Sequence, residues 1–458
     1  MTDIPPKSDP SVPPGSFGLP IIGESLLFLL DPNFAKKRQA RYGSIFKTSI
    51  LGQKTVVMTG PEASRFLLST HADHFSWREG WPGTFRELLG ESLFLQEGEQ
   101  HRRNRKLLRP AFHGTALCSY FDTMATLTQN YLDRWETMGS LVWFEEMKQL
   151  TFEIASTLLI GNHSGQSTAQ LSQWFTELTK GLFVLPIRWP WTTYGKAIAA
   201  RERLLEHIDA VIEERLESPT EDVLGMLMQS QDENGDRLSR EEIKVQALLM
   251  LFAGHETTTS MLVSMMMAIA QNPEVWTKAH VEQDALQASG NLDLEQLKQM
   301  PYLDQILKEV ERLYPPVSGG FRGVLKPFEF EGYHVPAGWK ALYRIDETHL
   351  DTRCFSNPSQ FDPDRFSPER AEHKRLSYSL VGFGGGPRVC LGLAFAKMEM
   401  KIVASLLLRN YTWTLEADQD LSLDPIPTLH PRSGLKIQFN RRVYSKVEER
   451  SIAAPSAV

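Results

Sequence analysis

The sequence predicts a mainly α-helical protein with small β-sheets, an α+β fold. Apolar residues recur at helical spacing in three stretches, 117–216, 239–271 and 303–313, and this spacing gives a helix one apolar face. Runs rich in β-branched residues, which favour strands, occur mainly near the beginning of the chain and after Pro316. The sequence shows no internal period of the kind that marks solenoids or propellers.

The composition is that of an ordinary soluble globular protein, with 41% hydrophobic and 23% charged residues among 458. A net charge of −7 gives no support for nucleic-acid binding, because nucleic-acid-binding domains are usually basic. The three cysteines are Cys118, Cys354 and Cys390. A sparse, odd number of cysteines argues against a disulfide framework, so we expect a reducing, cytoplasmic location.

Two apolar stretches raise the question of a membrane segment. The stretch 19–30 is short, is interrupted by Glu24 and follows no basic segment, so it is neither a signal peptide nor an anchor. The stretch 247–270 is long enough to span a bilayer, but His255 and Glu256 lie at its middle. A carboxylate there would cost several kcal/mol in lipid. We therefore expect a soluble protein with no transmembrane segment.

The first elements are short. Residues 1–15 hold five prolines and few apolar groups, which predicts a flexible N-terminal arm. The β-branched runs 45–47 and 55–58 predict a small hairpin around Gly52. A helix is expected over 61–68.

Later segments alternate between helices and breaks. The aromatic, glycine-rich segment 77–90 fits a surface loop and a lid over a pocket equally well. The helical stretch 117–216 is expected to break at Gly161-Asn162 and again within 185–191, where prolines occur. The polar tail, residues 443–458, is expected to be flexible.

The longest predicted helix begins at Ser239 and contains an unusual centre. Glu242, three residues later, completes a capping box, and Asn272-Pro273 ends the helix after Gln271. Its centre, 253–259, is a poor helix sequence, because glycine and a threonine triplet both weaken a helix interior.

A Thr257 hydroxyl bonded to the Ala253 carbonyl would open the helix locally, and Gly254 would remove side-chain bulk beside the opening. A small polar gap in an apolar helix suits oxygen and a water molecule. The alternative is a kinked helix with a surface Glu256, although the flanks are too apolar for a surface helix.

The segment 383–392 is a glycine-rich loop with one arginine and one cysteine. A helix is expected to follow over 394–408. Cys390 would then lie where a helix begins, and the free N–H groups and helix dipole there would lower its pKa and favour the metal-binding thiolate. Considered alone, a single cysteine is more often buried and inert.

Charged side chains form two further patterns on predicted helices. His101 and Arg105 are four residues apart and share one face of a helix. Three other basic residues form a second stripe, and its simplest interpretation is a solvated surface; they are Arg102, Lys106 and Arg109. Glu309 and Arg312 have the spacing of an ion pair within the helix 303–313, and Glu311 is expected to face solvent.

Four motifs in this chain resemble, in order, those of the cytochrome P-450 family. The loop 383–392 fills every fixed position of the family's haem-ligand pattern: Phe, two free positions, Gly, one free position, Arg, one free position, Cys, one free position, Gly. The segment 253–257 resembles the family's oxygen-binding motif, 309–312 its Glu-x-x-Arg and 363–366 its Pro-x-Arg-Phe. The resemblance implies one large haem domain, residues 16–442, with the haem between the long central helix and the helix after the cysteine.

The resemblance also implies a role for individual residues around haem b. Cys390 would be the axial ligand of the iron, and Glu256 and Thr257 would relay protons to bound oxygen. The other cofactor-binding positions are His101, Arg105, Arg322 and Arg388 at the propionates, and Phe383 in the ligand loop. Arg365 would join Glu309 and Arg312 in a buried structural network. One departure is His101, where many members have Trp, although related branches also have His.

The function that the resemblance implies is a haem-thiolate monooxygenase that uses O2 to hydroxylate a hydrophobic small molecule. Electrons would come from a separate ferredoxin or flavodoxin with an NAD(P)H reductase, and the second basic stripe is a candidate docking site for it. The segments 252–258 and 315–322 look like a bacterial branch related to animal retinoic acid hydroxylases. This favours a retinoid, or a related isoprenoid or fatty acid, with Val317 and Phe321 bordering the substrate pocket.

Two other functions remain open. A haem-thiolate peroxygenase or hydroperoxide-rearranging enzyme needs no reductase, but such relatives usually lose the acid–threonine pair or alter the cysteine loop. A haem-based sensor or lipid-binding protein would have no turnover and therefore no need of a proton relay.

Overall fold

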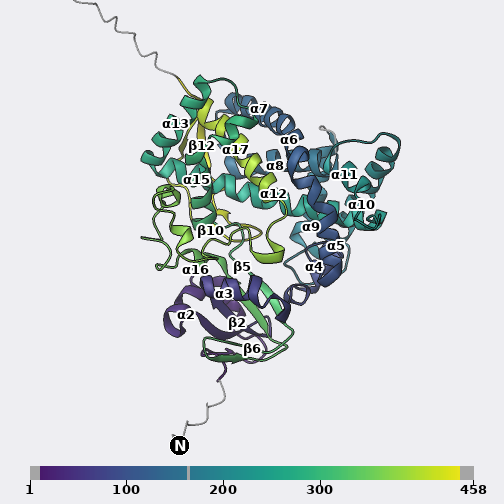
Figure 1. The fold of residues 1–458 in the computed structure, drawn as a ribbon, viewed down its shortest axis with the longest axis vertical. Helices are drawn as coiled ribbons and strands as arrows, with labels where there is room; N and C mark the ends of the chain where they lie inside the picture. Colours follow the sequence, from purple (N-terminus) through teal and green to yellow (C-terminus); the bar gives the residue numbers. More distant parts are fainter. Residues whose placement is uncertain (1–10, 162–165, 444–458) are drawn as a thin grey trace, which may run out of the picture.

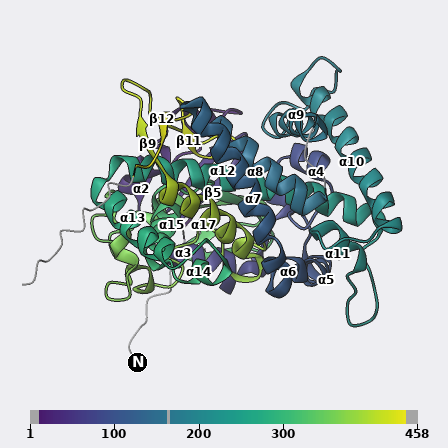
Figure 2. The same cartoon turned by 90° about the horizontal axis from the view of Figure 1, so that it is seen from above.

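A long helix, α12 (Arg240–Gln271), crosses the middle of the molecule (Figures 1 and 2). The computed structural model describes residues 11–161 and 166–443. Almost every residue of α12 from Gln246 to Ile269 is buried, and the helix packs against α8, α10, α15 and α17. Such a helix is apolar on all sides because it forms the core of a large domain.

Further helices pack around α12, while α2 and α3 lie at the far end of the molecule beside β2 (Figure 1). The α-helices are α1 (Ser25–Leu30), α2 (Phe34–Tyr42), α3 (Pro61–Arg65), α4 (Gly83–Leu89), α5 (Gly98–Leu108), α6 (Gly114–Ser119), α7 (Phe121–Met138), α8 (Trp143–Ile160), α9 (Gln166–Lys180), α10 (Thr193–Glu217), α11 (Val223–Gln229), α12 (Arg240–Gln271), α13 (Pro273–Ala288), α14 (Leu294–Lys298), α15 (Pro301–Leu313), α16 (Ile345–His349) and α17 (Leu393–Asn410). One π-helical turn (Phe66–Thr70) and 3-10 turns complete them; the 3-10 turns are Ala72–His74, Arg78–Gly80, Arg109–Phe112, Pro363–Phe366, Glu372–Lys374 and Gly386–Arg388.

Among the described residues, four small sheets accompany the helices. The strands are β1 (Ile45–Ile50), β2 (Gln53–Thr59), β3 (Phe75–Ser76), β4 (Ser140–Val142), β5 (Gly319–Val324), β6 (Phe328–Phe330), β7 (Tyr333–Val335), β8 (Lys340–Arg344), β9 (Tyr411–Leu415), β10 (Leu423–Asp424), β11 (His430–Pro431) and β12 (Lys436–Arg441). The largest sheet has the order β1-β2-β8-β5-β3, in which only β2 and β8 run parallel. It lies at one end of the molecule, beside α2 and α3 near the bottom of Figure 1. The predicted mainly α fold with small sheets is therefore confirmed.

Several predicted elements are present where the sequence places them. The hairpin β1–β2 turns at Leu51-Gly52, with Ile50 opposite Gln53. Both halves of the capping box at Ser239 form, since its side chain accepts the Glu242 N–H and the Glu242 carboxylate accepts the Ser239 N–H. The segment 77–90, expected to be a surface loop or a lid, contains a helix, α4, in its second half.

The predicted flexible ends are only partly within the described residues. Residues 1–10 and 444–458 lie outside them. Residues 11–15 do not form a free arm. The Pro14 carbonyl accepts a hydrogen bond from the Lys47 N–H, and the Ser11 carbonyl accepts one from the His334 N–H. A proline carbonyl remains a good acceptor although proline has no N–H to donate, so this segment can pair with a strand.

None of the described helices is long and apolar enough to cross a membrane. The apolar part of α12 is instead covered by the surrounding helices.

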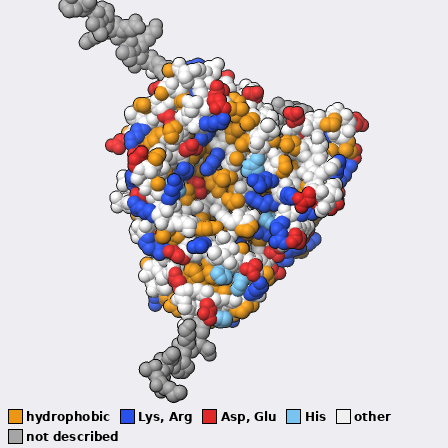
Figure 3. All heavy atoms as spheres, in the orientation of Figure 1, with side chains coloured by type: hydrophobic (Ala, Val, Ile, Leu, Met, Phe, Trp, Pro, Cys, Tyr) orange, Lys and Arg blue, Asp and Glu red, His pale blue; other side chains and the backbone are white. Residues whose placement is uncertain are grey.

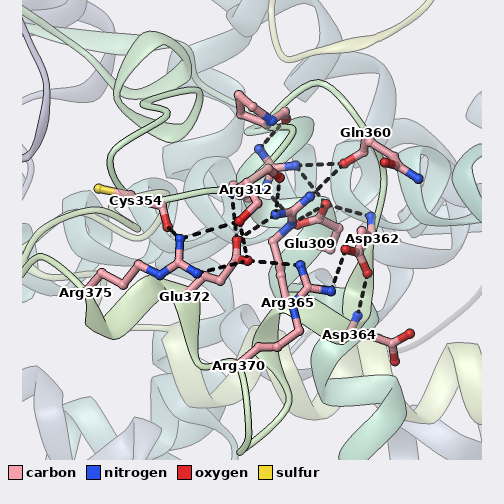
Figure 4. Close-up of polar contacts among 12 residues, drawn as sticks. Glu309, Arg312, Cys354, Gln360, Asp362, Asp364, Arg365, Arg370, Glu372 and Arg375 are labelled. Carbon is pink, nitrogen blue, oxygen red and sulfur yellow. Dashed lines mark hydrogen bonds and ion pairs between the residues drawn. The ribbon is translucent and has the colours of Figure 1, made fainter.

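A buried network of charges joins α15 to the segment that follows α16 (Figure 4). Arg312 donates two hydrogen bonds of 2.7 Å to the Glu309 carboxylate, and Arg365 donates a third at 3.0 Å. All three side chains are fully buried. Arg365 also pairs with Glu372 at 2.8 Å, and Arg312 donates to the carbonyl of His349. The predicted network of Glu309, Arg312 and Arg365 is therefore confirmed.

The prediction that Glu311 faces solvent is wrong. Only 6% of this residue is exposed, because the loop before Cys390 covers this face of α15: a Cβ atom on Gly382 would lie 2.5 Å from its Cγ. Burial raises the pKa of Glu311 to about 7.

We predict that replacing Arg312 with Met lowers the free energy of unfolding by about 3–5 kcal/mol, because it leaves part of a buried carboxylate uncompensated. Urea denaturation followed by circular dichroism measures this loss. Arg353 is a matched control, since its ion pairs with Glu62 and Asp351 lie at the surface, and its replacement with Met should cost less than about 1 kcal/mol. Equal losses in the two variants would contradict the structural role of the network.

Candidate active site

The cysteine loop is held close to the backbone of a neighbouring turn. Gly386 has a φ of 61°, and a Cβ atom there would lie 2.0 Å from the Leu68 carbonyl oxygen, so only glycine fits. The Cys390 N–H donates to the Phe383 carbonyl at 2.9 Å and closes the loop. The helix α17 then begins at Leu393.

The sulfur of Cys390 faces open space although protein surrounds it. The residue is exposed, yet burial raises the pKa of its thiol above the ordinary value. The prediction that the pKa of Cys390 is lowered is therefore wrong for the protein without a bound metal. The Gly392 N–H and Arg105 do lower it, but α17 starts three residues after Cys390, so few free N–H groups reach the sulfur. A coordinated metal deprotonates a thiol outright.

The centre of α12 has the predicted hydrogen bond. The Thr257 hydroxyl donates to the Ala253 carbonyl at 2.7 Å, while the helix stays α-helical throughout this segment. Ala253 is exposed although its helix crosses the core, which indicates an open space beside it. Gly254 does not widen this space: a Cβ atom there would lie 3.2 Å from Leu159 of α8, so the glycine lets the two helices approach.

Glu256 is a buried acid with unused hydrogen-bonding capacity. It is 2% exposed, and neither carboxylate oxygen has a hydrogen-bond partner among the described residues. Its closest cation is Lys148 of α8, with 3.4 Å between Nζ and Oε1. Lys148 is about a quarter exposed (23%), so it connects the buried carboxylate with the protein surface.

His255 is buried next to Glu256, with 3.8 Å between its Nε2 and the Oε1 of that carboxylate. Its Nδ1 lies 2.9 Å from the Thr151 hydroxyl, and its ring contacts Phe152 and Phe175 edge-on. Burial holds the pKa of His255 well below its ordinary value, so the ring is neutral. These contacts explain the residue as part of the core.

Four basic side chains from three elements gather on one side of the cysteine loop: two come from α5, one from β5 and one from the turn Gly386–Arg388. Arg105 donates to the Val389 carbonyl at 2.7 Å, next to Cys390. Arg388 donates to the Gln96 carbonyl, and Arg322 donates to the Phe321 carbonyl at 2.7 Å and to the Tyr343 hydroxyl at 3.3 Å. His101 is the fourth and is buried.

The arginines repel one another and disfavour a charge on His101. Burial, followed by Arg322, lowers the pKa of Arg388 to about 10, and Arg105 adds to the effect. Burial, followed by Arg388 and Arg105, lowers the pKa of His101 to about 4. The carboxylate of Glu97 opposes the lowering at Arg388 and stabilises the charge of that side chain. Such an undercompensated cluster favours binding of a ligand with two negative charges.

The sequence did not reveal Trp77 as a member of this cluster. Its ring lies 3.3 Å from the Arg322 guanidinium carbon and 5.0 Å from that of Arg388, so it stacks against both cations. Its indole N–H is buried and has no partner among the described residues. The only signal in the sequence was the aromatic character of the segment 77–90.

An aromatic row runs away from the basic cluster. Successive ring centroids lie 5.6 Å apart for Trp77–Phe94, 5.1 Å for Phe94–Trp81, 4.7 Å for Trp81–Phe85 and 5.3 Å for Phe85–Phe183. Phe321, by contrast, lies on the opposite face of β5 from Arg322 and packs against Phe28. Phe321 therefore packs against the N-terminal helices, and the prediction that it borders the substrate pocket beside Arg322 is wrong.

The residues fit a haem. The predicted metal ligand, Cys390, is exposed within the fold, and the buried cations beside the loop lack enough carboxylates to balance them. Across the site, an exposed alanine and a buried acid without hydrogen bonds lie on α12. Open space, a soft ligand and a site for two carboxylates are what haem b requires.

Comparisons with known proteins agree with this geometry. The family model described as Cytochrome P450 matches residues 13–439. The chain is 42% identical over 432 residues to putative cytochrome P450 120 of Synechocystis sp. (strain ATCC 27184 / PCC 6803 / Kazusa), covering 94% of this chain and 97% of the relative. It is 34% identical to cytochrome P450 26B1 of Xenopus tropicalis, covering 93% of this chain and 86% of that protein.

A solved structure is similar over nearly the same length. The cyanobacterial CYP120A1 with bound retinoic acid superposes with a TM-score of 0.88 at 40% sequence identity, covering 95% of this chain and 100% of that one. Members of the matching family are haem-thiolate monooxygenases that act on hydrophobic substrates and need redox partners. The chain therefore belongs to the cytochrome P450 family and is a haem-dependent oxidoreductase.

Proposed function

We propose that this protein hydroxylates a retinoid acid or a closely related elongated isoprenoid or fatty acid. The observation that carries the proposal is the similarity to a cytochrome P450 whose structure contains retinoic acid. The aromatic row from Trp77 to Phe183 supports it, because aromatic side chains offer a long apolar surface to a polyene chain.

Cys390 would be the ligand of the haem iron, and the four basic residues, His101, Arg105, Arg322 and Arg388, would hold the two propionates. The bound haem supplies the oxidising chemistry, and thiolate ligation favours cleavage of the O–O bond. Contacts within the protein fix the arginines that would orient the haem. Arg105 is held by the carbonyl of Val389, next to Cys390. Arg322 is held between the Trp77 ring and the Tyr343 hydroxyl.

Thr257 and Glu256 supply protons on the opposite side. The Thr257 hydroxyl is anchored to the Ala253 carbonyl and would hold a proton beside the open space next to α12. Glu256 replenishes that proton, and Lys148 keeps the carboxylate within reach of the surface. A positioned acid of this kind contributes about 10²–10⁴-fold in rate.

A separate ferredoxin or flavodoxin with its NAD(P)H reductase provides the electrons. Arg102 and Lys106 are exposed on α5, and Arg109 is exposed at the start of the 3-10 turn that follows it. Figure 3 shows blue side chains gathered where Figure 1 labels this helix. Arg102 and Lys106 are paired with Glu99 and Glu233. An acidic partner would exchange these surface pairs for its own carboxylates, which favours fast but weak association.

We expect all-trans retinoic acid to convert the ferric haem from low spin to high spin with a dissociation constant of about 1–10 μM, which corresponds to about 7–8 kcal/mol of binding free energy. Absorbance titration measures the shift, and chromatography of turnover mixtures detects a hydroxylated product. Palmitic acid and retinol separate the contributions of the chain and the carboxylate. If neither retinoic acid nor palmitic acid produced a spin shift, the proposed substrate class would be contradicted.

Replacing Thr257 with Ala should lower the product formed per O2 consumed by about tenfold or more, because proton delivery is lost. Thr258 is a matched control: it bonds the Gly254 carbonyl in the same way, at 2.8 Å, but is buried. Its replacement with Ala should leave coupling near that of the wild type. Unchanged coupling in Thr257→Ala would favour a peroxygenase or rearranging enzyme, which needs no relay.

A further inference from the structure

Glu311 lies behind the cysteine loop, at a position that no motif specifies. It occupies a free position of the Glu-x-x-Arg segment in α15. Its carboxylate accepts the backbone N–H groups of Gly382 and Phe383. Because a Cβ atom on Gly382 would lie 2.5 Å from the Cγ of Glu311, the side chain is pressed against the backbone of the loop.

The start of the loop is therefore held at three consecutive N–H groups. The Val381 N–H donates to Nε2 of His349 at 2.8 Å, and the next two N–H groups donate to Glu311. Nδ1 of His349 in turn lies 3.0 Å from the Arg312 carbonyl oxygen. Successive N–H groups that converge on a carboxylate form a stable anion site.

One residue separates this anion site from the proposed iron ligand. Phe383 donates its N–H to Glu311, and its carbonyl accepts the Cys390 N–H at 2.9 Å. Movement of the carboxylate is therefore transmitted to Cys390 through a single residue. The negative charge of Glu311 also acts on the sulfur directly, since it raises the pKa of Cys390.

We propose that Glu311 is a positioning residue for the proximal ligand: its carboxylate fixes the start of the cysteine loop, and its charge tunes the ease with which the haem is reduced. This inference rests on the proposed ligation of the haem by Cys390.

The charge of Glu311 changes near neutral pH. Burial raises its pKa to about 7, opposed by Lys397 of α17, by the two N–H groups and by Lys308 of its own helix. Below this pKa the Glu311 carboxyl is neutral, and above it the group carries a negative charge that acts on Cys390. A negative charge near the thiolate disfavours the addition of an electron to the haem. The reduction potential of the haem should therefore fall as the pH rises through about 7.

The test uses the full-length, haem-loaded protein and the variants Glu311→Gln and Glu311→Leu. Gln keeps the size and one acceptor oxygen but cannot ionise, whereas Leu removes the acceptor. We measure the reduction midpoint potential across about two pH units centred on 7 and the spectrum of the reduced CO complex. The wild type should show a fall in potential that is absent in Glu311→Gln, with thiolate-type spectra in both. Glu311→Leu should show a larger fraction of the spectrum typical of a protonated or lost thiolate.

Glu282 provides a matched control. Its carboxylate also accepts two consecutive N–H groups, those of Tyr302 at 2.6 Å and Leu303 at 3.1 Å, and burial raises its pKa. It does so at the opposite end of α15, so Glu282→Gln should keep the pH dependence of the wild type.

Identical potential–pH profiles in the wild type and Glu311→Gln would overturn the proposal, as would loss of the dependence in Glu282→Gln. A wild type without a thiolate-type CO spectrum would overturn the ligation by Cys390 as well. A thiolate-type wild type with no effect at Glu311 would overturn the role of Glu311 alone.

Discussion

Glu309 has both carboxylate oxygens inside the protein, where an ionised carboxylate is stable only if cations and N–H groups surround it. Arg312 and Arg365 meet this requirement, and each also donates to carbonyls of the irregular segment 356–360. That segment has little regular structure of its own, so the charges fix its path. Through His349 the same network reaches the N–H of Val381. The position of the cysteine loop thus depends on the buried charge cluster of Glu309, Arg312 and Arg365.

A second group of buried charges has the opposite character. Around Glu309 the positive and negative groups balance, whereas Arg105, Arg322 and Arg388 outnumber the carboxylates near them. Balanced charges give rigidity, and unbalanced charges give affinity for an anionic group. The balanced cluster contacts the start of the cysteine loop through His349 and Val381, and the arginine cluster contacts its end through Arg105 and Val389. The first cluster therefore holds the loop in place, and the second is suited to hold the haem propionates.

Local signals predicted the parts of the structure that local physics determines. The capping box at Ser239, the hairpin turn at Gly52 and the back-bond of Thr257 each involve residues at most a few positions apart. The motif resemblance added the buried pairing of Arg365 with Glu309, which no local rule contains.

Three contacts that the sequence did not predict arise from packing between distant elements. Glu311 is buried because a loop seventy residues later in the chain covers it, and Phe321 faces away from Arg322 because strand residues alternate. The stacking of Trp77 on Arg322 depends on how β5 and the turn after β3 meet. No spacing along the sequence encodes these contacts, because they arise only when the sheet and helices are assembled.

The most direct test of the account is the spectrum of the reduced, CO-bound protein with Cys390 intact and with Cys390 replaced by His. Cys118 and Cys354 are the matched controls, one exposed and one buried, each replaced by Ser. We predict the long-wavelength band typical of thiolate-ligated haem in the wild type and both controls, and its loss only in Cys390→His. A wild-type spectrum typical of histidine ligation, or a band that survives in Cys390→His, would contradict it.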